Sequence, residues 1–455
     1  MPARPPRQAA RYIIAFLLAL VSLVGFAQPA SAHNSFVSSD PADGARLTPV
    51  PQQLLLTFAS PVVLAQLQVD YTDASGVRTA LTGFDFGPSG QTDVSVPVPE
   101  AASGEVSFRW KLVGADGHIV SGRVGLSIEA PSVAPAAPAA PTLPPSEAPT
   151  EPAVETTTET TTAVPTIAND STPAPAAAKW LLRVLGFLGL VMIGGAVVTS
   201  AFLWIPAWHE VIVRRAAGWG IALIAGSAAL SLAIFASEAT GLGVALGTSH
   251  GVALVARLVI VPLVGLALFQ WYPDDEMQRW TGISVGLVAL AATWSWSGHP
   301  KSLSWPILGV PLDIAHLVAG SAWIGGLAYM GIVVMRTASD EEQTAAVHAF
   351  APVASKSVSI LVVTGALQSL RIDGSPLNLF ITAHGRLLLL KIVVLCLMLY
   401  IANVNRTRVM TRFRHKQPTR GARTMLQRAM VTEAVVGIVI LAMTAALVVN
   451  SPPPG

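Results

Sequence analysis

The sequence has little charge and almost no cysteine. Charged residues make up 12% of the 455 positions, hydrophobic residues make up 52%, and Cys396 is the single cysteine. Soluble proteins carry about twice that proportion of charge. One cysteine excludes disulfides and paired-cysteine metal or redox sites. The net charge of +2 comes with no basic face of the kind that binds nucleic acid, so we expect a membrane protein without a nucleic-acid partner.

Residues 1–32 have the three regions of a secretory signal peptide. Arg4, Arg7 and Arg11 precede the apolar run YIIAFLLALVSLVGF, and ASA at 30–32 has the small residues of a cleavage site. The apolar run is short for a membrane-spanning helix of roughly 20 residues. We therefore favour cleavage over the alternative, an uncleaved anchor helix, and we expect the residues that follow to lie outside the cytoplasm.

Residues 33–130 predict a small all-β domain. The runs QLLLTF, LQVDYT, VSFRWKLV and GRVGLSIE are typical of strands, and PADG, DASG and EAASG are typical of turns. This length and pattern indicate a Greek-key sandwich or barrel with Phe58, Phe108 and Trp110 in its core. Residues 131–178 are rich in Pro, Ala, Thr and Glu and contain no Lys or Arg, so they predict a disordered linker.

Eight hydrophobic runs of membrane-spanning length follow within residues 179–450, ahead of a C-terminal tail at 451–455. They lie at about 180–204, 216–237, 250–271, 280–297, 311–335, 354–371, 384–404 and 429–449. The stretch between the last two is rich in Arg and Lys and is therefore cytoplasmic by the positive-inside rule. Counting back, Lys179 begins an eight-helix transmembrane bundle on the outside. We expect a multi-pass plasma-membrane protein whose β domain and C-terminus are extracytoplasmic.

Cleavage after Ala32 makes His33 the first residue of the mature chain. Its free amine and its ring Nδ1 can close a six-membered chelate on a metal ion, because an amine of pKa about 8 loses its proton to a strong Lewis acid near pH 7. Asp116 and His118 are two residues apart, so they point to the same side of extended backbone. Each feature alone fits an accident at a mobile terminus or an ordinary polar turn. Together they favour a metal site.

These amine, imidazole and carboxylate ligands suit tetragonal Cu(II), with Zn(II) as the alternative. Residues 33–130 contain no Met and no Cys, so a thioether Cu(I) site within them is excluded. The stretches HNSFVSSDPADGARLTPVPQQLLLTFASPV and VSFRWKLVGADGHIVSG resemble the CopC family of periplasmic copper-binding proteins. The resemblance implies a cupredoxin-like Greek-key β-barrel that binds Cu(II) at His33, Asp116 and His118.

Ionisable residues gather near the predicted outer ends of the hydrophobic runs. They are Glu238, His250, Arg257, His299, Asp313, His316, His384, Arg386 and Lys391. Because such groups are costly at membrane depth and face a partner or a pathway, six of them form a candidate copper path: Glu238, His250, His299, Asp313, His316 and His384. Capping of helix ends is the alternative, above all for His250 and His384. Lys391 snorkels or pairs with Asp313.

The segments SGHP, DIAHLVAGSAWIGGL, GRLLLLKIVVLCLMLYIANVNR and RAMVTEAVVGIVILAMTAAL resemble the CopD copper-resistance membrane domain. The resemblance points to nine family positions: His299, His316, Trp323, Gly325, Gly326, Lys391, Asn405, Arg406 and Glu433. Among these, Gly325 and Gly326 are expected to permit close helix approach, and Glu433 is expected to neutralise Arg406.

Taken in order, these segments predict a protein that is not an enzyme. The β domain captures copper outside the cell, from copper ions or from an unidentified extracytoplasmic donor, and the lipid-embedded bundle conducts it inward. The sequence has no P-loop and no DKTG motif, which disfavours ATP-driven pumping. Two alternatives stay open. One is a haem- or copper-containing electron-transfer protein, and the other is copper sequestration with the bundle as an anchor.

Overall fold

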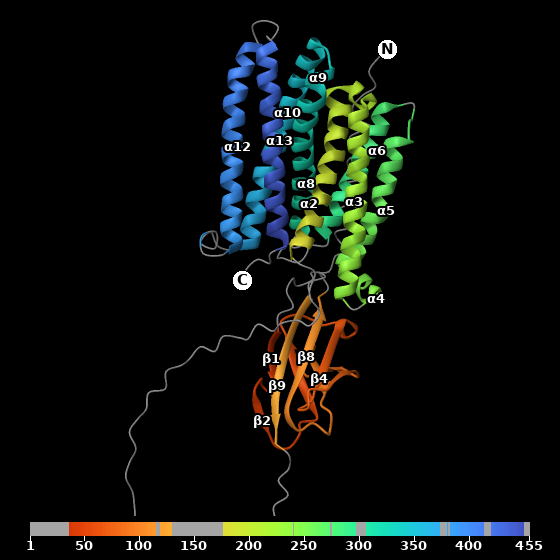
Figure 1. Ribbon diagram of the computed structural model, residues 1–455, viewed down its shortest axis with the longest axis vertical. Coiled ribbons are helices and arrows are strands. Elements are labelled where there is room, and N and C mark those ends of the chain that lie inside the picture. Colours follow the sequence, from red (N-terminus) through yellow and green to blue (C-terminus); the bar gives the residue numbers. More distant parts are fainter. Residues whose placement is uncertain are drawn as a thin grey trace, which may run out of the picture. The chain divides into compact units, whose positions relative to one another are not determined.

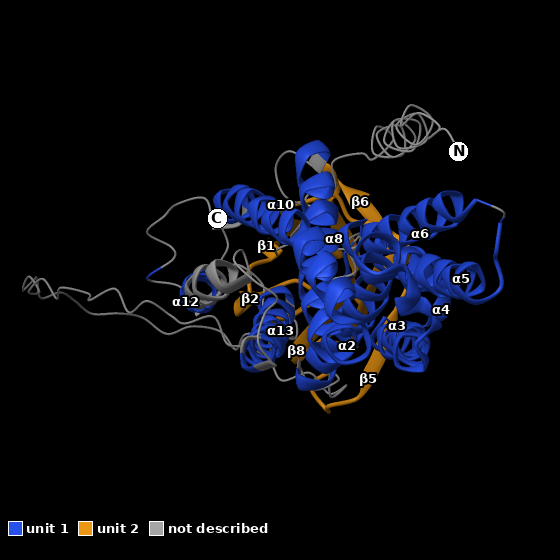
Figure 2. Ribbon diagram, turned by 90° about the horizontal axis from the view of Figure 1, so that it is seen from above, with its two compact units in different colours: residues 1–33, 113–119, 173–455 blue, residues 34–112, 120–172 orange. Residues whose placement is uncertain are grey.

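The computed structural model describes most of the chain outside its two ends and the predicted linker. The described residues are 36–114, 119–129, 176–239, 241–273, 275–296, 306–373, 380, 383–413 and 420–449. They form two compact units, a β unit and a helical unit (Figure 2). The predicted signal peptide, the C-terminal tail and residues 131–175 of the predicted linker lie outside the described residues, whereas residues 176–178 begin a helix.

The β unit consists of two sheets. The first has four strands in the order β1 (Phe36–Asp40), β3 (Gln53–Phe58), β7 (Gly90–Pro97) and β6 (Asp85–Gly87). The second has five in the order β2 (Ala45–Leu47), β9 (Ile119–Ile128), β8 (Gly104–Val113), β4 (Leu67–Thr72) and β5 (Arg78–Leu81). Strand β2 pairs with β9 in parallel, whereas β4 pairs antiparallel with both of its neighbours. The predicted β domain is therefore confirmed.

Alternation along the strands sets the core of the β unit. In a strand, every second side chain faces the same side of the sheet. In β3 the buried positions are accordingly Leu54, Leu56 and Phe58. The predicted core aromatics are confirmed, since Phe58, Phe108 and Trp110 expose 2%, 0% and 2% of their surface.

The helical unit contains eight long helices among the described residues (Figure 1). They are α2 (Ala176–Val198), α3 (Val211–Glu238), α5 (Ser249–Phe269), α6 (Glu276–Trp296), α8 (Pro306–Tyr329), α10 (Asp340–Asp373), α12 (Ala383–Phe413) and α13 (Arg420–Val449). Shorter turns lie between them: η2 (Thr199–Leu203), η3 (Ile205–His209), α4 (Leu242–Leu246), η4 (Met330–Val334) and α9 (Met335–Thr337). Each predicted hydrophobic run falls largely or wholly within one long helix and the turns that continue it.

Six segments of the described chain are long and apolar enough to cross a membrane. They are Ala177–Leu203, Val211–Glu238, Ser249–Phe269, Ile307–Thr337, Asp340–Arg371 and Arg423–Val448. Helices α6 and α12 are not among them, so length and composition account for six of the eight predicted spans. Six such helices make this chain a multi-pass membrane protein.

Helix α10 begins earlier than the hydrophobic run that predicted it. The run starts near residue 354, but the helix starts at Asp340 because Ser339 and Glu342 form a capping box. The Ser339 amide donates to the Glu342 carboxylate at 2.8 Å, and the Glu342 amide donates to the Ser339 hydroxyl at 3.3 Å. His348 therefore lies on α10.

Glycines let the helices that surround the site approach closely. A Cβ atom on Gly325 of α8 would lie 2.6 Å from the Cα of Gly195 in α2, and one on Gly326 would lie 2.7 Å from the ring of Phe350 in α10. Neither position has space for a side chain. Small residues allow this backbone contact in membrane bundles, and here it fixes α8 between α2 and α10.

Candidate functional site

The predicted copper ligands of the β unit, His33, Asp116 and His118, all lie outside the described residues. The described residues nearest to them in the sequence pack against one another through aromatic rings. The Phe36 ring lies 5.2 Å from the Trp110 ring and 6.1 Å from the Phe58 ring, centroid to centroid. A Cβ atom on Gly122 would lie 2.6 Å from Cε2 of the Trp110 indole, so that glycine gives the indole its space.

This packing brings three chain segments to one end of the β unit. Phe36 opens β1, Trp110 lies three residues before the end of β8, and Gly122 lies three residues after the start of β9. His33 precedes Phe36 by three residues, and Asp116 and His118 belong to the connection between β8 and β9. In the sequence, therefore, the three predicted ligands adjoin the described ends of β1, β8 and β9.

In the helical unit, Asp313 of α8 is held by neutral donors. The Ser295 hydroxyl of α6 donates to its Oδ2 at 2.7 Å, and the Gln368 amide of α10 lies 3.5 Å from its Oδ1. Arg183 of α2 and Lys391 of α12 attract Asp313 electrostatically. Five helices therefore contribute to one polar cluster around this carboxyl group. Lys391 forms no direct ion pair with Asp313, unlike one of the two arrangements that the sequence suggested.

His316 lies one turn further along α8, and its hydrogen bond determines which ring nitrogen is free. Its Nδ1 is 2.8 Å from the Thr364 hydroxyl oxygen in α10, and that hydroxyl donates its single proton to the Ile360 carbonyl at 2.6 Å. When the hydroxyl donates to that carbonyl, its oxygen accepts a hydrogen bond from Nδ1–H of His316. In that tautomer the Nε2 lone pair is available to a metal ion.

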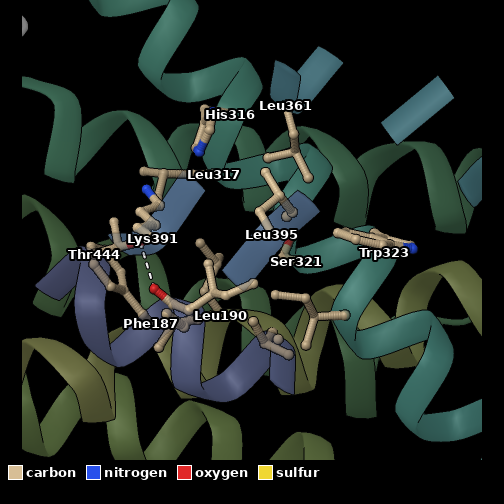
Figure 3. Close-up of a pocket in the computed structure, with 16 residues that line it drawn as sticks. Phe187, Leu190, His316, Leu317, Ser321, Trp323, Leu361, Lys391, Leu395 and Thr444 are labelled. Atoms are coloured by element: carbon tan, nitrogen blue, oxygen red, sulfur yellow. Dashed lines mark hydrogen bonds between the residues drawn. The ribbon is translucent and has the colours of Figure 1, made fainter. Parts of the chain in front are cut away.

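A cavity of about 90 Å³ opens beside His316 and Lys391. Most of its lining is apolar, and it comes from α2, α8, α10, α12 and α13: Phe187, Leu190, Val191, His316, Leu317, Gly320, Ser321, Trp323, Ile324, Leu361, Lys391, Leu395, Gly437, Ile440, Leu441 and Thr444. Figure 3 shows the imidazole and the ammonium group at the same end of this cavity. They are the two ionisable groups among its described lining residues.

Some of the remaining predicted residues make contacts elsewhere in the helical unit. The side chains of the others are not described. Glu238 forms an ion pair with Lys179 at 2.7 Å, and the His250 ring stands edge-on to Phe235 at 4.9 Å. Neither Glu238 nor His250 lines the cavity. Glu433 lies on α13. His299 lies outside the described residues, as do the side chains of His384, Asn405 and Arg406.

Four residues of the cluster were missing from the sequence prediction: Arg183, Ser295, Thr364 and Gln368. The available signal in the sequence was the presence of polar residues within apolar helices. Assigning them partners requires the packing of α2, α6 and α10 around α8. Among the described residues, no group of three or more His, Cys, Asp and Glu side chains forms a metal-binding cluster.

Comparison with known proteins assigns two domains. Residues 36–129 match the CopC domain, and residues 344–447 match Copper resistance protein D, the CopD domain. The chain is also similar over most of its length to the Copper transport protein CutJ of Bacillus subtilis (strain 168). The two are 23% identical over 465 residues, which cover 96% of this chain and 78% of that protein.

Two solved structures match the β unit. CopC from Methylosinus trichosporium OB3b is 21% identical, with a TM-score of 0.20, over 21% of this chain and 94% of that chain. PcoC, a methionine-rich copper resistance protein from Escherichia coli, is 19% identical, with a TM-score of 0.20, over 22% of this chain and 100% of that chain. The two domain matches give the chain a CopC domain followed by a CopD domain.

Proposed function

We propose that the β unit binds copper as Cu(II) outside the cell and that the helical unit carries copper inward across the membrane, without catalysing a reaction. His316, which lines a cavity between the helices and contacts Thr364 through Nδ1, carries this proposal. A buried imidazole with a fixed tautomer is suited to bind a metal transiently. The pairing of CopC and CopD domains and the name of the Bacillus relative support copper as the substrate.

The Cu(II) site of the β unit consists of the His33 amine and ring, Asp116 and His118. Phe36, Trp110 and Gly122 support this assignment because they tether these segments to one end of the unit. Nitrogen and carboxylate ligands favour Cu(II), which heads the divalent affinity series. The strands around the site follow the cupredoxin-like Greek-key arrangement that CopC domains imply.

The helical unit crosses the membrane eight times, with α6 and α12 as the two further spans. Helix α6 has 21 residues, which at 1.5 Å per residue is about 31 Å, enough for the hydrocarbon core. The basic segment between α12 and α13 is cytoplasmic. The β unit and the C-terminus then lie outside the cell, and Asp313 and His316 lie in the outer part of the bundle.

Two variants test the relay. An extra residue placed before His33 in the mature chain removes the amine from the site, so Cu(II) affinity should fall by orders of magnitude in a titration of the purified protein. Unchanged affinity contradicts the chelate. His316→Ala should lower cellular copper accumulation, whereas His348→Ala, exposed on the same bundle, should leave it unchanged. Equal accumulation in both variants contradicts the membrane path, and a rise contradicts import.

A haem-bearing bundle is less well supported. Haem needs a larger space than about 90 Å³ and axial ligands, and His316 is the one histidine among the described residues that line the cavity. A Soret band in the purified protein would favour that alternative. Pure sequestration leaves the cluster around Asp313 without a role.

A further inference from the structure

Charges around the Asp313 cluster do not balance. One carboxylate, Asp313, lies within electrostatic reach of Arg183 and Lys391, and Arg183 also repels Arg257. Arg257 is 6% exposed, donates to the Thr293 hydroxyl at 2.9 Å and lies with its guanidinium carbon 3.7 Å from the centroid of the Trp294 ring. Neither of these two contacts supplies negative charge. The described groups of the cluster therefore carry an excess of positive charge.

The excess is not removed by direct ion pairs. Both oxygens of Asp313 are taken by Ser295 and Gln368. Within the described part of the chain, neither Arg183 nor Lys391 makes a hydrogen bond or an ion pair, although both side chains are at least half buried. Cations without partners are costly in the low dielectric of a membrane bundle. An anion beside Lys391 would lower the electrostatic cost of burying the positive charge of this cluster.

The cavity offers space for such an anion. A single water molecule needs roughly 10–15 Å³, and the cavity beside Lys391 has about 90 Å³. Phe187 lines this cavity one helical turn after Arg183, and Figure 3 shows Lys391 directed toward the end where His316 lies. Guanidinium and ammonium groups both bind small anions through charge-assisted hydrogen bonds.

We propose that a small monovalent inorganic anion, such as chloride, binds at the end of the cavity where Lys391 and His316 lie, with Arg183 as the second cation of the surrounding cluster. The anion site is inferred from the excess of positive charge and from the cavity beside Lys391. The role of the bound anion in copper transport rests on the proposed function. His316 offers copper one nitrogen, and the bound halide supplies a second ligand and a counter-charge, so copper passes the two cations as a halide complex rather than as a bare ion.

Chloride binding tests the site without copper. Purified full-length protein in lipid nanodiscs should bind ³⁶Cl⁻ saturably, in competition with bromide. Lys391→Met should weaken this binding at least tenfold, Arg183→Gln should weaken it similarly, and Lys391→Arg should retain it because the charge stays. Arg214→Gln, an exposed arginine of α3, is the control and should bind as the wild type does. Absence of saturable binding, or equal binding by wild type and Lys391→Met, overturns the proposal.

Copper flux distinguishes this inference from the proposed function. In proteoliposomes, replacing chloride by gluconate should reduce copper entry about tenfold in the wild type. Equal copper entry in both salts overturns the halide complex and leaves copper transport standing. If chloride binds and no copper enters in either salt, the transport function and the halide complex fall while the anion site stands.

Discussion

The Nδ1 atom of His316 lies 2.8 Å from the hydroxyl oxygen of Thr364, which itself lies 2.6 Å from the Ile360 carbonyl oxygen. This pair orients the imidazole ring that we propose to bind copper. Removing the hydroxyl frees the ring to rotate and to exchange its tautomer. Groups that orient a metal-binding histidine in this way typically contribute a factor of 10–100 in affinity or activity.

Thr364→Val, which keeps the shape and removes the hydroxyl, should therefore lower copper entry into proteoliposomes by about tenfold. Thr364→Ser should restore it, since serine can make the same two hydrogen bonds. Thermal unfolding of each variant separates this effect from misfolding. Similar copper entry with valine and with serine contradicts the orienting role.

Phe36 should couple the stability of the β unit to copper affinity. Its ring packs on Trp110 and Phe58, and it follows His33 by three residues in the sequence. Phe36→Ala should destabilise the β unit by about 2 kcal/mol through lost apolar and ring contacts. It should also weaken Cu(II) binding at least tenfold, because the terminus that we propose to chelate copper lies three residues before this packed ring.

Calorimetric titration of the full chain with Cu(II) measures the affinity, and hydrogen exchange of residues 36–129 measures the stability. Val37→Ala is the matched control, because the neighbouring Val37 is 60% exposed and should change neither quantity. Loss of stability with unchanged Cu(II) affinity indicates that Phe36 has a packing role alone.

Gly325 should tolerate no side chain. Its position against Gly195 means that Gly325→Ala must separate α8 from α2, and such overpacking typically costs about 1–3 kcal/mol. Gly226→Ala is the control: a Cβ atom there meets nothing within 4 Å, and alanine favours the helix by roughly 1 kcal/mol. Thermal midpoints in detergent should therefore fall for Gly325→Ala and stay or rise for Gly226→Ala. A lower midpoint for Gly226→Ala alone would contradict this account.

Local sequence patterns predicted the strands and helices. They did not predict which side chains of different helices contact one another. Strand β3 matches the run QLLLTF because alternation is a property of neighbouring residues. The start of α10 was missed although Ser339 and Glu342 carry a capping signal, because the hydrophobic run was taken as the boundary. Thr364 and Ser295 became part of the site only through helix packing, which no local pattern in the sequence specifies.

Acid should weaken the turn between β4 and β5. Asp73 accepts hydrogen bonds through Oδ1 from the Ser75 hydroxyl at 2.7 Å and from the Ser75 and Val77 amides at 2.9 Å. The Ser75 hydroxyl contributes most to the lowered pKa of the Asp73 carboxyl group, followed by the Val77 amide. A lowered folded-state pKa means that the stabilisation is complete above the unfolded pKa of about 3.9 and is lost as the pH falls through the folded value.

Hydrogen exchange of the full chain, corrected for the intrinsic rate at each pH, should show the amides of Ser75 and Val77 losing protection below about pH 4. Asp73→Asn should remove that dependence, because an amide oxygen can accept the same hydrogen bonds without titrating. Asp70→Asn, on β4 of the same hairpin, should leave the dependence in place. If Asp73→Asn loses protection over the same pH interval as the wild type, another group controls the turn, since the substituted residue has no proton to gain there.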